Sequence, residues 1–280
     1  MDIKELFGLE HKNVVITGAG SGMGGAAARL LCALGANVYA SVRRKSLDFP
    51  VTKEIRTDLG NKAGTERMID ECPDTIDALF LCHGIANAPD KANALQVQFT
   101  NFYSFLYLTR RLLPRIADNG SVTFISSDGG KDWRRSIQEC KEVISCKSWE
   151  EAAVWYQSHP ACTNDGYVFA KKCQNVYVMD QCHAPEFIDR KIRLNAIAPG
   201  MTKTGLTEDF NRSVTGDPTQ GQAILEKYSL DFWNGRWASP EEMGYPLVTI
   251  GSQIFSYMSG QILYIDYGTA SLWEMKELTS

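Results

Sequence analysis

The sequence has no long apolar run and no excess of positive charge. No segment approaches the roughly 18 uninterrupted apolar residues of a membrane-spanning helix, and the start, MDIKELFGLEHKN, lacks the apolar stretch of a secretory signal. With 33 acidic and 29 basic residues the net charge is −4, so no overall basic field would hold nucleic acid or an anionic membrane. We therefore expect a cytoplasmic protein without nucleic-acid or membrane partners.

Cysteine pairs with metal-site spacing are also lacking. The eight cysteines contain no C-x-x-C pair and only four histidines accompany them, so we expect no metal site. Several cysteines lie in apolar runs, such as Cys32 in RLLCALG and Cys82 in LFLCHG, where a free cysteine behaves as a small hydrophobe. Reduced core thiols are therefore favoured over disulfides.

Strand-like and helix-length segments alternate along the chain. Apolar residues make up 44% of it, enough for one domain over 1–280 with a full core. Helices are expected between the strands, with a long one from about Gln96 to Asp118. The expected strands span 13–17, 36–42, 54–57, 76–82, 121–127, 192–198 and the run GQILYID near the end. This alternation predicts a Rossmann-like α/β fold with a doubly wound parallel sheet.

Two segments interrupt the alternation. Residues 128–163 are too long for an ordinary loop and rich in helix formers, so they are interpreted as a helical insertion. Residues 204–236 are polar and mixed, and are interpreted as a mobile surface excursion.

A glycine cluster in NVVITGAGSGMGGAAARLL lies between the first strand and the first long helix. Backbone N–H groups at a helix N-terminus, with no Cβ in the way, let a pyrophosphate approach closely. A flexible turn is the alternative, but the position at the first βα turn favours nucleotide binding. Two registers fit: Gly20, Gly22 and Gly25, or Gly18, Gly22 and Gly24, of which the second is preferred because it begins directly after the strand.

The end of the second strand bears on the choice of nucleotide. An acidic residue there binds the ribose hydroxyls of NAD, but here the position is Val42 and Arg43 follows. A guanidinium in place of a carboxylate favours NADP(H) over NAD(H), because arginine binds a phosphate in bidentate geometry. Ser21 stands where a second basic residue often supports NADP, and a solvated turn at Arg43 is the alternative.

With TGAGSGMG, LCHG, ISS, YVFAK and PGMTKT in this order, the chain resembles the short-chain dehydrogenase/reductase family from about Lys12 to Gly268. The insertion and the LCHG variation look most like the bacterial 3α-hydroxysteroid dehydrogenase/carbonyl reductase branch. The resemblance implies a catalytic tetrad of Asn101, Ser127, Tyr167 and Lys171, with Asn101 holding a proton-relay water. It also implies a homodimer or homotetramer. With the glycine loop and Arg43, the expected cofactor contacts are Gly18, Ser21, Gly22, Met23, Gly24, Arg43, Asp58, Leu59, Cys82, Gly84, Tyr167, Lys171, Pro199, Gly200, Thr202 and Thr204.

The implied tetrad agrees with the chemistry of carbonyl reduction. The oxygen that receives a hydride needs a proton, and a phenol supplies one if a nearby cation brings its pKa from about 10 toward neutrality. Tyr167 and Lys171 are spaced i, i+4 and share a helix face. His83, which replaces the usual alanine of the family, and His159 suggest a histidine base instead, but neither has an acid partner at a recognisable spacing.

The insertion bears on the substrate. It separates Ser127 from Tyr167, and its aromatic residues either line the cleft for a fused-ring or aromatic substrate or pack the insertion onto the body or another subunit. Phe232, Trp233 and Trp237 would close over a hydrophobic substrate from the other side. A hydroxysteroid or bile-acid dehydrogenase is favoured; the alternatives are an aryl-alcohol dehydrogenase or general carbonyl reductase, and a non-catalytic dinucleotide-binding redox sensor. The aromatic residues of the insertion are Trp133, Trp149, Trp155 and Tyr156.

Overall fold

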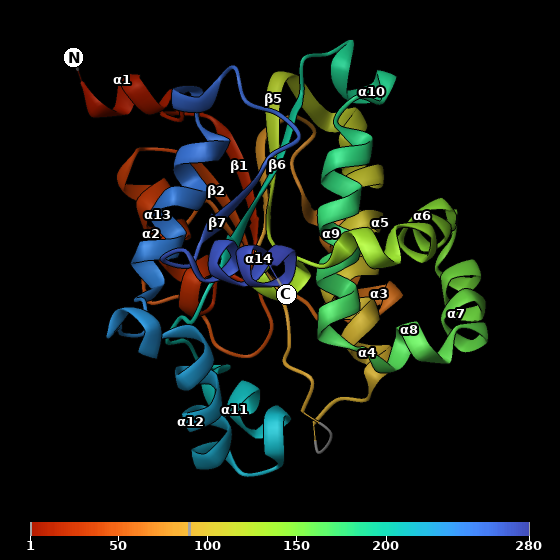
Figure 1. Ribbon diagram of the computed structural model, residues 1–280. Coiled ribbons are helices and arrows are strands. Elements are labelled where there is room, and N and C mark those ends of the chain that lie inside the picture. Colours follow the sequence, from red (N-terminus) through yellow and green to blue (C-terminus); the bar gives the residue numbers. More distant parts are fainter. Residues whose placement is uncertain (1, 89–90, 280) are drawn as a thin grey trace.

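A seven-stranded parallel sheet forms the centre of the molecule (Figure 1). The computed structural model describes residues 2–88 and 91–279. The strand order is β3-β2-β1-β4-β5-β6-β7, and every neighbouring pair is parallel. The strands are β1 (Asn13–Thr17), β2 (Asn37–Val42), β3 (Lys53–Arg56), β4 (Ile76–Leu81), β5 (Ile116–Ile125), β6 (Arg193–Pro199) and β7 (Ile262–Ile265). The predicted doubly wound α/β fold is confirmed.

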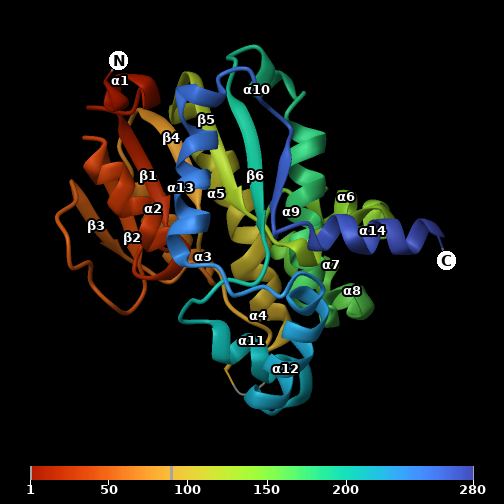
Figure 2. The same cartoon turned by 60° about the vertical axis from the view of Figure 1, so that its left-hand side comes forward.

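Helices cover both faces of the sheet and divide the core into two halves (Figure 2). Strand side chains alternate between the halves: Val14 and Ile16 belong to one core and Val15 to the other. One face is covered by α2 (Gly22–Ala33) and α13 (Pro240–Gly251), with α1 (Ile3–Phe7) at its edge. The other is covered by α3 (Lys62–Glu71), α4 (Ala94–Gln98), α5 (Ser104–Leu112) and α9 (Tyr167–Gln181). All residues of β6 are buried, as expected for a strand covered on both faces.

The predicted helix from Gln96 to Asp118 is wrong at its end. A π-helical turn (Phe99–Tyr103) joins α4 to α5, and α5 ends at Leu112. Pro114 lies in the short 3₁₀ turn that follows, and β5 already begins at Ile116. Proline cannot continue an α-helix because it lacks the N–H donor and its ring clashes with the preceding turn.

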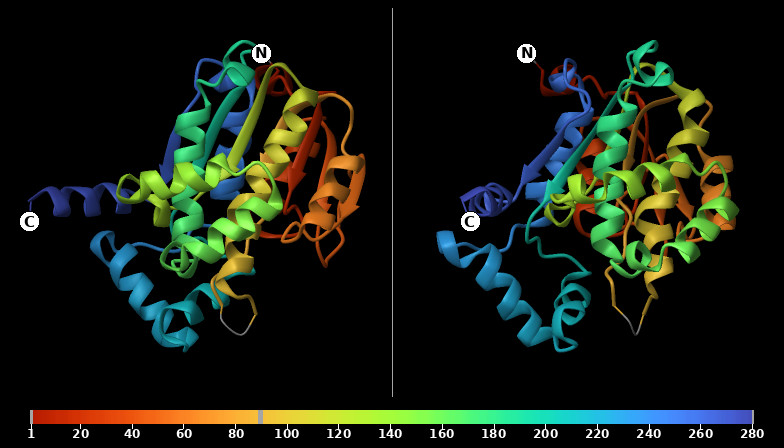
Figure 3. Two further views of the ribbon diagram at one scale, coloured as in Figure 1. Left: turned by 90° about the vertical axis from the view of Figure 1, so that its right-hand side faces the viewer. Right: turned by 45° about the vertical axis from the view of Figure 1, so that its right-hand side comes forward.

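The segment 204–236, interpreted as a mobile excursion, is largely helical. It contains α11 (Thr207–Thr215) and α12 (Pro218–Ser229) beyond the carboxyl ends of the strands (Figures 1 and 3). Gly216 ends α11 in the left-handed conformation, and the Asp217 side chain caps the first N–H groups of α12. These local capping signals make a helical hairpin of a segment that looks irregular by composition.

The expected helical insertion is present between Ser127 and Tyr167. After 3₁₀ turns at Asp128–Gly130 and Trp133–Ser136 it forms α6 (Ile137–Ser145), α7 (Trp149–Ser158) and α8 (Pro160–Asn164).

The aromatic residues of the insertion pack onto the body. Trp149 stacks on Phe99 with ring centroids 4.8 Å apart, Trp155 stacks on Phe169 at 5.9 Å, and Tyr156 is buried. Trp133 also packs against this core. Of the two alternatives for these side chains, packing holds for these residues, and the insertion braces the π-helical turn and α9 from outside.

The remaining helices lie at the periphery. They are α10 (Pro185–Ile188) and α14 (Thr269–Thr279), and α14 projects from the body of the molecule (Figure 3). All eight cysteines are free thiols. Within the described ranges, no helix combines the length and apolar character needed to cross a bilayer.

Candidate active site

The glycine loop connects β1 to the N-terminus of α2. Gly18 has φ +69°, and a Cβ there would come within 2.8 Å of the His83 backbone. A Cβ on Gly24 would lie 2.5 Å from the Gly18 carbonyl oxygen, whereas one on Gly25 would meet its nearest neighbour at 3.2 Å. The tightest backbone approaches therefore fall on Gly18 and Gly24, which distinguish the preferred register, while Gly22 is common to both registers.

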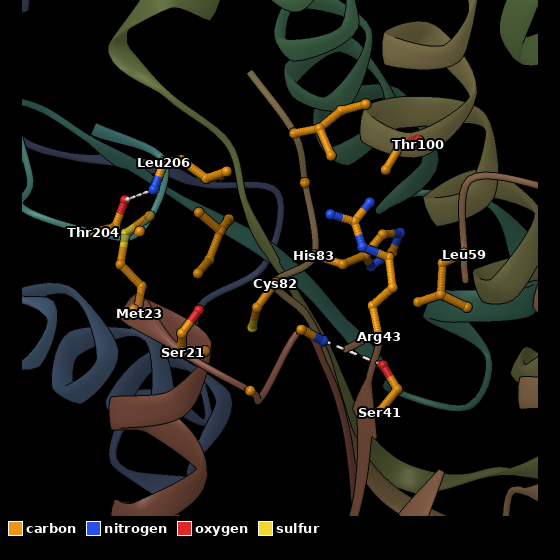
Figure 4. A pocket seen from close by; sticks show the side chains of 18 of the residues that line it. Ser21, Met23, Ser41, Arg43, Leu59, Cys82, His83, Thr100, Thr204 and Leu206 are labelled. Carbon is orange, nitrogen blue, oxygen red and sulfur yellow. Dashed lines mark hydrogen bonds between the residues drawn. The ribbon is translucent and has the colours of Figure 1, made fainter. Parts of the chain in front are cut away.

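A cavity of about 340 Å³ opens beside this loop, at the carboxyl ends of β1, β2, β4 and β5 (Figure 4). The N-termini of α2 and α9, together with α11, complete its wall. The loop presents small residues and N–H groups to this space, and the N-terminus of α2 points to it, so the site fits the pyrophosphate of a dinucleotide. Predicted residues in the lining are Gly18, Ser21, Gly22, Met23, Gly24, Arg43, Asp58, Leu59, Cys82, Gly84, Tyr167, Lys171 and Thr204.

Five predicted residues do not line this cavity, namely Pro199, Gly200, Thr202, Asn101 and Ser127. Pro199 ends β6 and is buried. The Thr202 hydroxyl donates to the Gly200 carbonyl at 3.0 Å. Asn101 lies in the π-helical turn and Ser127 follows β5, and neither is among the lining residues.

The β2 end of the cavity carries positive charge. Val42 is buried, and Arg43 and Arg44 follow it; Figure 4 shows the Arg43 side chain pointing into the cavity. Both arginines also line an adjoining cavity of about 680 Å³, together with Asp58. The carboxylate of Asp58 accepts a hydrogen bond from the Gly60 N–H at 3.0 Å and lies at the end of β3, so no carboxylate occupies the end of β2 itself.

Tyr167 begins α9, and α4 fixes this start. The peptide before it bends at Gly166, which has φ +57°. The amide of the buried Gln98 donates to the Gly166 carbonyl at 2.9 Å and to the Thr163 carbonyl at 3.3 Å. On the cavity side the ring of Phe210, from α11, meets the Tyr167 ring edge-on with centroids 4.9 Å apart.

Lys171 lies one turn further along α9 and is buried. Its Nζ is 5.3 Å from the centre of the Tyr167 ring, so the expected pairing along one helix face is present. Nζ donates to the Ile125 carbonyl at 2.7 Å and to the Gln174 side-chain oxygen at 3.2 Å. Two of its three N–H donors therefore point into the protein.

The expected lowering of the phenol pKa is not found. Burial raises the pKa of Tyr167, and its hydrogen bond with Ser127 opposes this only in part. Burial also lowers the pKa of Lys171 to about 7, so its positive charge is weakly held. With its pKa above the ordinary value, Tyr167 is protonated at neutral pH.

Ser127 lies two residues beyond β5 and caps the 3₁₀ turn that opens the insertion. Its Oγ accepts from the Gly129 N–H at 3.1 Å and donates to Asp128 Oδ1 at 2.9 Å. Burial raises the pKa of the Asp128 carboxyl to about 6, with the hydrogen bond from Ser127 acting in the opposite direction. A carboxyl group that titrates near neutrality thus adjoins the serine.

Asn101 fixes the loop after β4. Its side chain donates to the Ile85 carbonyl and accepts from the Ile85 N–H, both at 2.8 Å. The backbone carbonyl oxygen of Asn101 accepts a hydrogen bond from Gln174 Nε2 at 2.6 Å. Asn101, the residue expected to hold a relay water, therefore has its backbone carbonyl bonded to a side chain.

Neither histidine is arranged as a catalytic base. His83 Nδ1 lies 2.7 Å from the Thr17 hydroxyl and Nε2 lies 2.7 Å from the Ser104 hydroxyl. Burial lowers the pKa of His83 to about 3, so the ring is neutral and ties β1 to α5 through the β4 loop. His159 stacks on Trp155 at the end of α7 and does have an acid partner, since its Nε2 lies 3.6 Å from Glu142 Oε2, but it does not line the cavity.

Several residues of the cavity wall were not predicted from the sequence. Ile85, Thr100, Leu206 and Phe210 line the cavity. Phe210 and Leu206 lie in the segment interpreted as mobile, and no motif distinguishes them. They become wall residues because α11 packs over the start of α9.

Two family models match the chain. The model described as short chain dehydrogenase matches residues 12–137, and that described as enoyl-(acyl carrier protein) reductase matches residues 162–270. The chain belongs to the short-chain dehydrogenase/reductase family. It is an oxidoreductase that acts on alcohol or carbonyl groups, with the pyridine-nucleotide-binding fold of the family.

Curated relatives match over nearly the whole length. A coniferyl-alcohol dehydrogenase from Pseudomonas sp. (strain HR199 / DSM 7063) is 29% identical, over 95% of this chain and 99% of the relative. A 3-alpha-hydroxysteroid dehydrogenase/carbonyl reductase from Comamonas testosteroni is 25% identical, over 91% and 95% respectively. Among solved structures, the 3-alpha-hydroxysteroid dehydrogenase from Pseudomonas sp. B-0831 complexed with NADH has a TM-score of 0.73 at 21% identity, covering 94% of this chain and 98% of that one. This structural likeness supports the fold.

Asp128 gives a testable pH dependence of stability. Its carboxyl has a pKa of about 6 in the folded state and about 3.9 when unfolded, so the folded state binds more protons between these values. The contribution of this group to stability therefore falls as pH rises from about 4 to 6. We expect Asp128→Asn to raise the free energy of unfolding by roughly 1–2 kcal/mol at about pH 7.5 and hardly at all near pH 4.

Urea unfolding at the two pH values measures this difference. Asp132→Asn is the control, because the Asp132 side chain is 38% exposed and pairs with Lys131. A gain for Asp128→Asn that is equal at both pH values would contradict the assignment.

Proposed function

We propose that the protein is an NADP(H)-dependent dehydrogenase/reductase that interconverts an aryl alcohol and its carbonyl compound. The observation that carries this proposal is the pair of Tyr167 and Lys171 in the wall of the dinucleotide cavity. Ser127 is hydrogen-bonded to the phenol, and the Phe210 ring meets the phenol ring edge-on. A dinucleotide bound in this cavity supplies or accepts the hydride.

The residues of this chain would move the proton. Tyr167 is protonated at neutral pH, so in the reductive direction it is ready to donate to the substrate oxygen. The Ser127 hydroxyl is hydrogen-bonded to the phenol, and it would polarise the same substrate oxygen once its O–H turns from Asp128 to that oxygen. Lys171 lies beside the ring and has one N–H left for the cavity, where it can bond a ribose hydroxyl and favour phenolate in the oxidative direction.

The preference for NADP(H) rests on the end of β2. A carboxylate at this position would repel a 2′-phosphate, but Val42 occupies it and Arg43 and Arg44 line the space beside it. Guanidinium groups recognise phosphate through paired hydrogen bonds, which supports the 2′-phosphorylated cofactor.

The aryl substrate is favoured by the space above Tyr167. A fused-ring steroid would need a broad apolar wall from the aromatic residues of the insertion. These side chains pack onto the body instead, as seen for Trp149, Trp155 and Tyr156. Phe210 stands edge-on to the phenol, and such an edge packs well against a flat ring. The coniferyl-alcohol dehydrogenase that matches over nearly the whole chain supports the same class.

A hydroxysteroid is the second candidate substrate. The relative from Comamonas testosteroni supports it, and so does the likeness in fold to the 3-alpha-hydroxysteroid dehydrogenase. A non-catalytic redox sensor would have no need of the tyrosine, lysine and serine together. A homodimer or homotetramer in the cytoplasm stays a prediction.

Turnover depends on the Tyr167 hydroxyl in this proposal. Tyr167→Phe removes the proton donor but keeps the ring that Phe210 contacts, so we expect kcat to fall by about 100-fold or more while the Kd for NADPH changes by less than about twofold. Stopped-flow or steady-state nicotinamide absorbance and fluorescence titration measure the two quantities.

A second tyrosine on the same helix serves as the control. Tyr177 is buried against Phe124 and does not line the cavity, so Tyr177→Phe should retain its activity. Undiminished turnover by Tyr167→Phe would contradict the proposed function, in which Tyr167 donates the proton.

An alcohol panel separates the two substrate classes. With coniferyl alcohol, benzyl alcohol and 3α-hydroxylated steroids as probes, we expect kcat/KM for the aryl alcohols to exceed that for the steroids by at least about tenfold. A tenfold ratio corresponds to ~1.4 kcal/mol of transition-state binding, which the loss of one contact between the substrate ring and Phe210 would account for. Turnover of steroids alone would select the second candidate.

Arg43 tests the cofactor preference. Loss of a charged hydrogen bond to phosphate should raise the KM for NADPH about tenfold or more in Arg43→Ala, because such bonds contribute roughly 1.5–3 kcal/mol. NADH is the internal control, since it lacks the phosphate and its KM should stay unchanged. An unaltered KM for NADPH would point to NAD(H).

A further inference from the structure

The Gln174 side chain bridges two members of the implied tetrad. It lies on α9, one turn after Lys171, and is fully buried. Its Oε1 accepts from Lys171 Nζ at 3.2 Å, and its Nε2 donates to the Asn101 carbonyl oxygen at 2.6 Å. A single amide thus spans the gap between the lysine on α9 and the π-helical turn that carries Asn101.

The chemistry of the neighbours sets the orientation of this amide. An ammonium can only donate and a carbonyl oxygen can only accept, so the oxygen of Gln174 faces Lys171 and its nitrogen faces Asn101. A water molecule between the same two groups would both accept and donate, and could pass a proton on. The amide has fixed donor and acceptor ends and cannot do so.

We propose that Gln174 is a positioning residue that replaces the relay water, holding Lys171 beside Tyr167 and closing the inner route for protons. This inference rests on the proposed function and refines its mechanism. The Ile125 carbonyl and Gln174 take two N–H donors of Lys171, so its third faces the cofactor cavity. The proton that Tyr167 exchanges then comes from the cavity and not from the interior.

The other groups around Lys171 contribute little charge. Tyr167 is protonated, burial raises the pKa of the Cys82 thiol, and burial keeps His83 neutral. The ring of Phe105, from α5, lies 5.8 Å from Nζ. Gln174 and the Ile125 carbonyl are therefore the polar contacts that favour protonated Lys171, and removal of the former disfavours it.

Two substitutions separate a positioning role from a packing role. Gln174→Leu keeps most of the volume but offers no acceptor and leaves no room for water. Gln174→Ala opens a polar space between Lys171 and the Asn101 carbonyl in which a water can bond to both groups. A packing role predicts that alanine is the worse variant, because it leaves the larger cavity. The proposed role predicts that leucine is worse.

The first readout is the pH profile of coniferyl alcohol oxidation with NADP⁺. Less protonated Lys171 favours phenolate less, so in Gln174→Leu we expect the acidic limb of kcat to move up by about one pH unit, with kcat near pH 7 reduced about tenfold. Gln174→Ala should lie between the leucine variant and the parent. Gln181→Leu on the same helix is the control, since the Gln181 side chain donates to its neighbour Asp180 away from the cavity, and it should behave as the parent.

The second readout does not depend on the substrate. Protonated Lys171 faces the cavity, so affinity for NADPH, measured by fluorescence titration, should fall as pH rises through the lysine pKa. In Gln174→Leu this fall should occur about one pH unit lower than in the parent. If the leucine variant does not fold, Gln174→Met, with a flexible apolar chain, replaces it in both measurements.

Failure of this inference is distinct from failure of the proposed function. Active Tyr167→Phe would remove the function and the inference with it. The inference alone would be overturned if Tyr167→Phe is inactive but Gln174→Leu behaves as the parent. In that case the kcat of Gln174→Leu lies within about twofold of the parent, and neither the acidic limb of its pH profile nor the pH dependence of its NADPH affinity moves. A lower kcat for Gln174→Ala than for Gln174→Leu would assign a packing role to Gln174.

Discussion

The burial of the Lys171 ammonium group is the constraint on which this site depends. Bringing a charge into the protein is costly unless hydrogen bonds replace its water, and the chain supplies them from β5 and from α9 itself, through the Ile125 carbonyl and Gln174. Gln174 in turn needs an acceptor for its amide, which the π-helical turn provides at Asn101. One buried charge thus links a strand end and two helices.

The loop after β4 is held in a similar way. Asn101 bonds to both polar groups of the Ile85 backbone, and the neutral ring of His83 connects the Thr17 and Ser104 hydroxyl groups. These bonds fix one wall of the cofactor cavity without using a charge. On the outside, Trp149 stacks on the π-helical turn that carries Asn101, and Trp155 stacks on α9, which carries Tyr167 and Lys171. The insertion therefore supports the site more than it shapes the opening.

Much of the architecture could be predicted because its signals are local. The alternation of strands and helices, and the first strand followed by closely spaced glycines, led to the observed sheet and to the glycine register. The errors have physical causes as well. Pro114 ended a helix that apolar content alone would have extended, and capping by Asp217 made helices in a polar segment. The raised pKa of Tyr167 was not foreseen, because the spacing of a lysine reveals neither its burial nor its charge.

By itself the sequence determined the family, the sheet, and the presence of Tyr167 and Lys171 on one helix face, since each of these follows from residues close together in the chain. Gln174 lies on that helix too, but its partner Asn101 is 73 residues away. Which groups meet a buried side chain depends on how helices pack across the core. Only the tertiary structure decided that an amide joins Lys171 to Asn101, that Phe210 covers the phenol, and that the insertion aromatics turn toward the body.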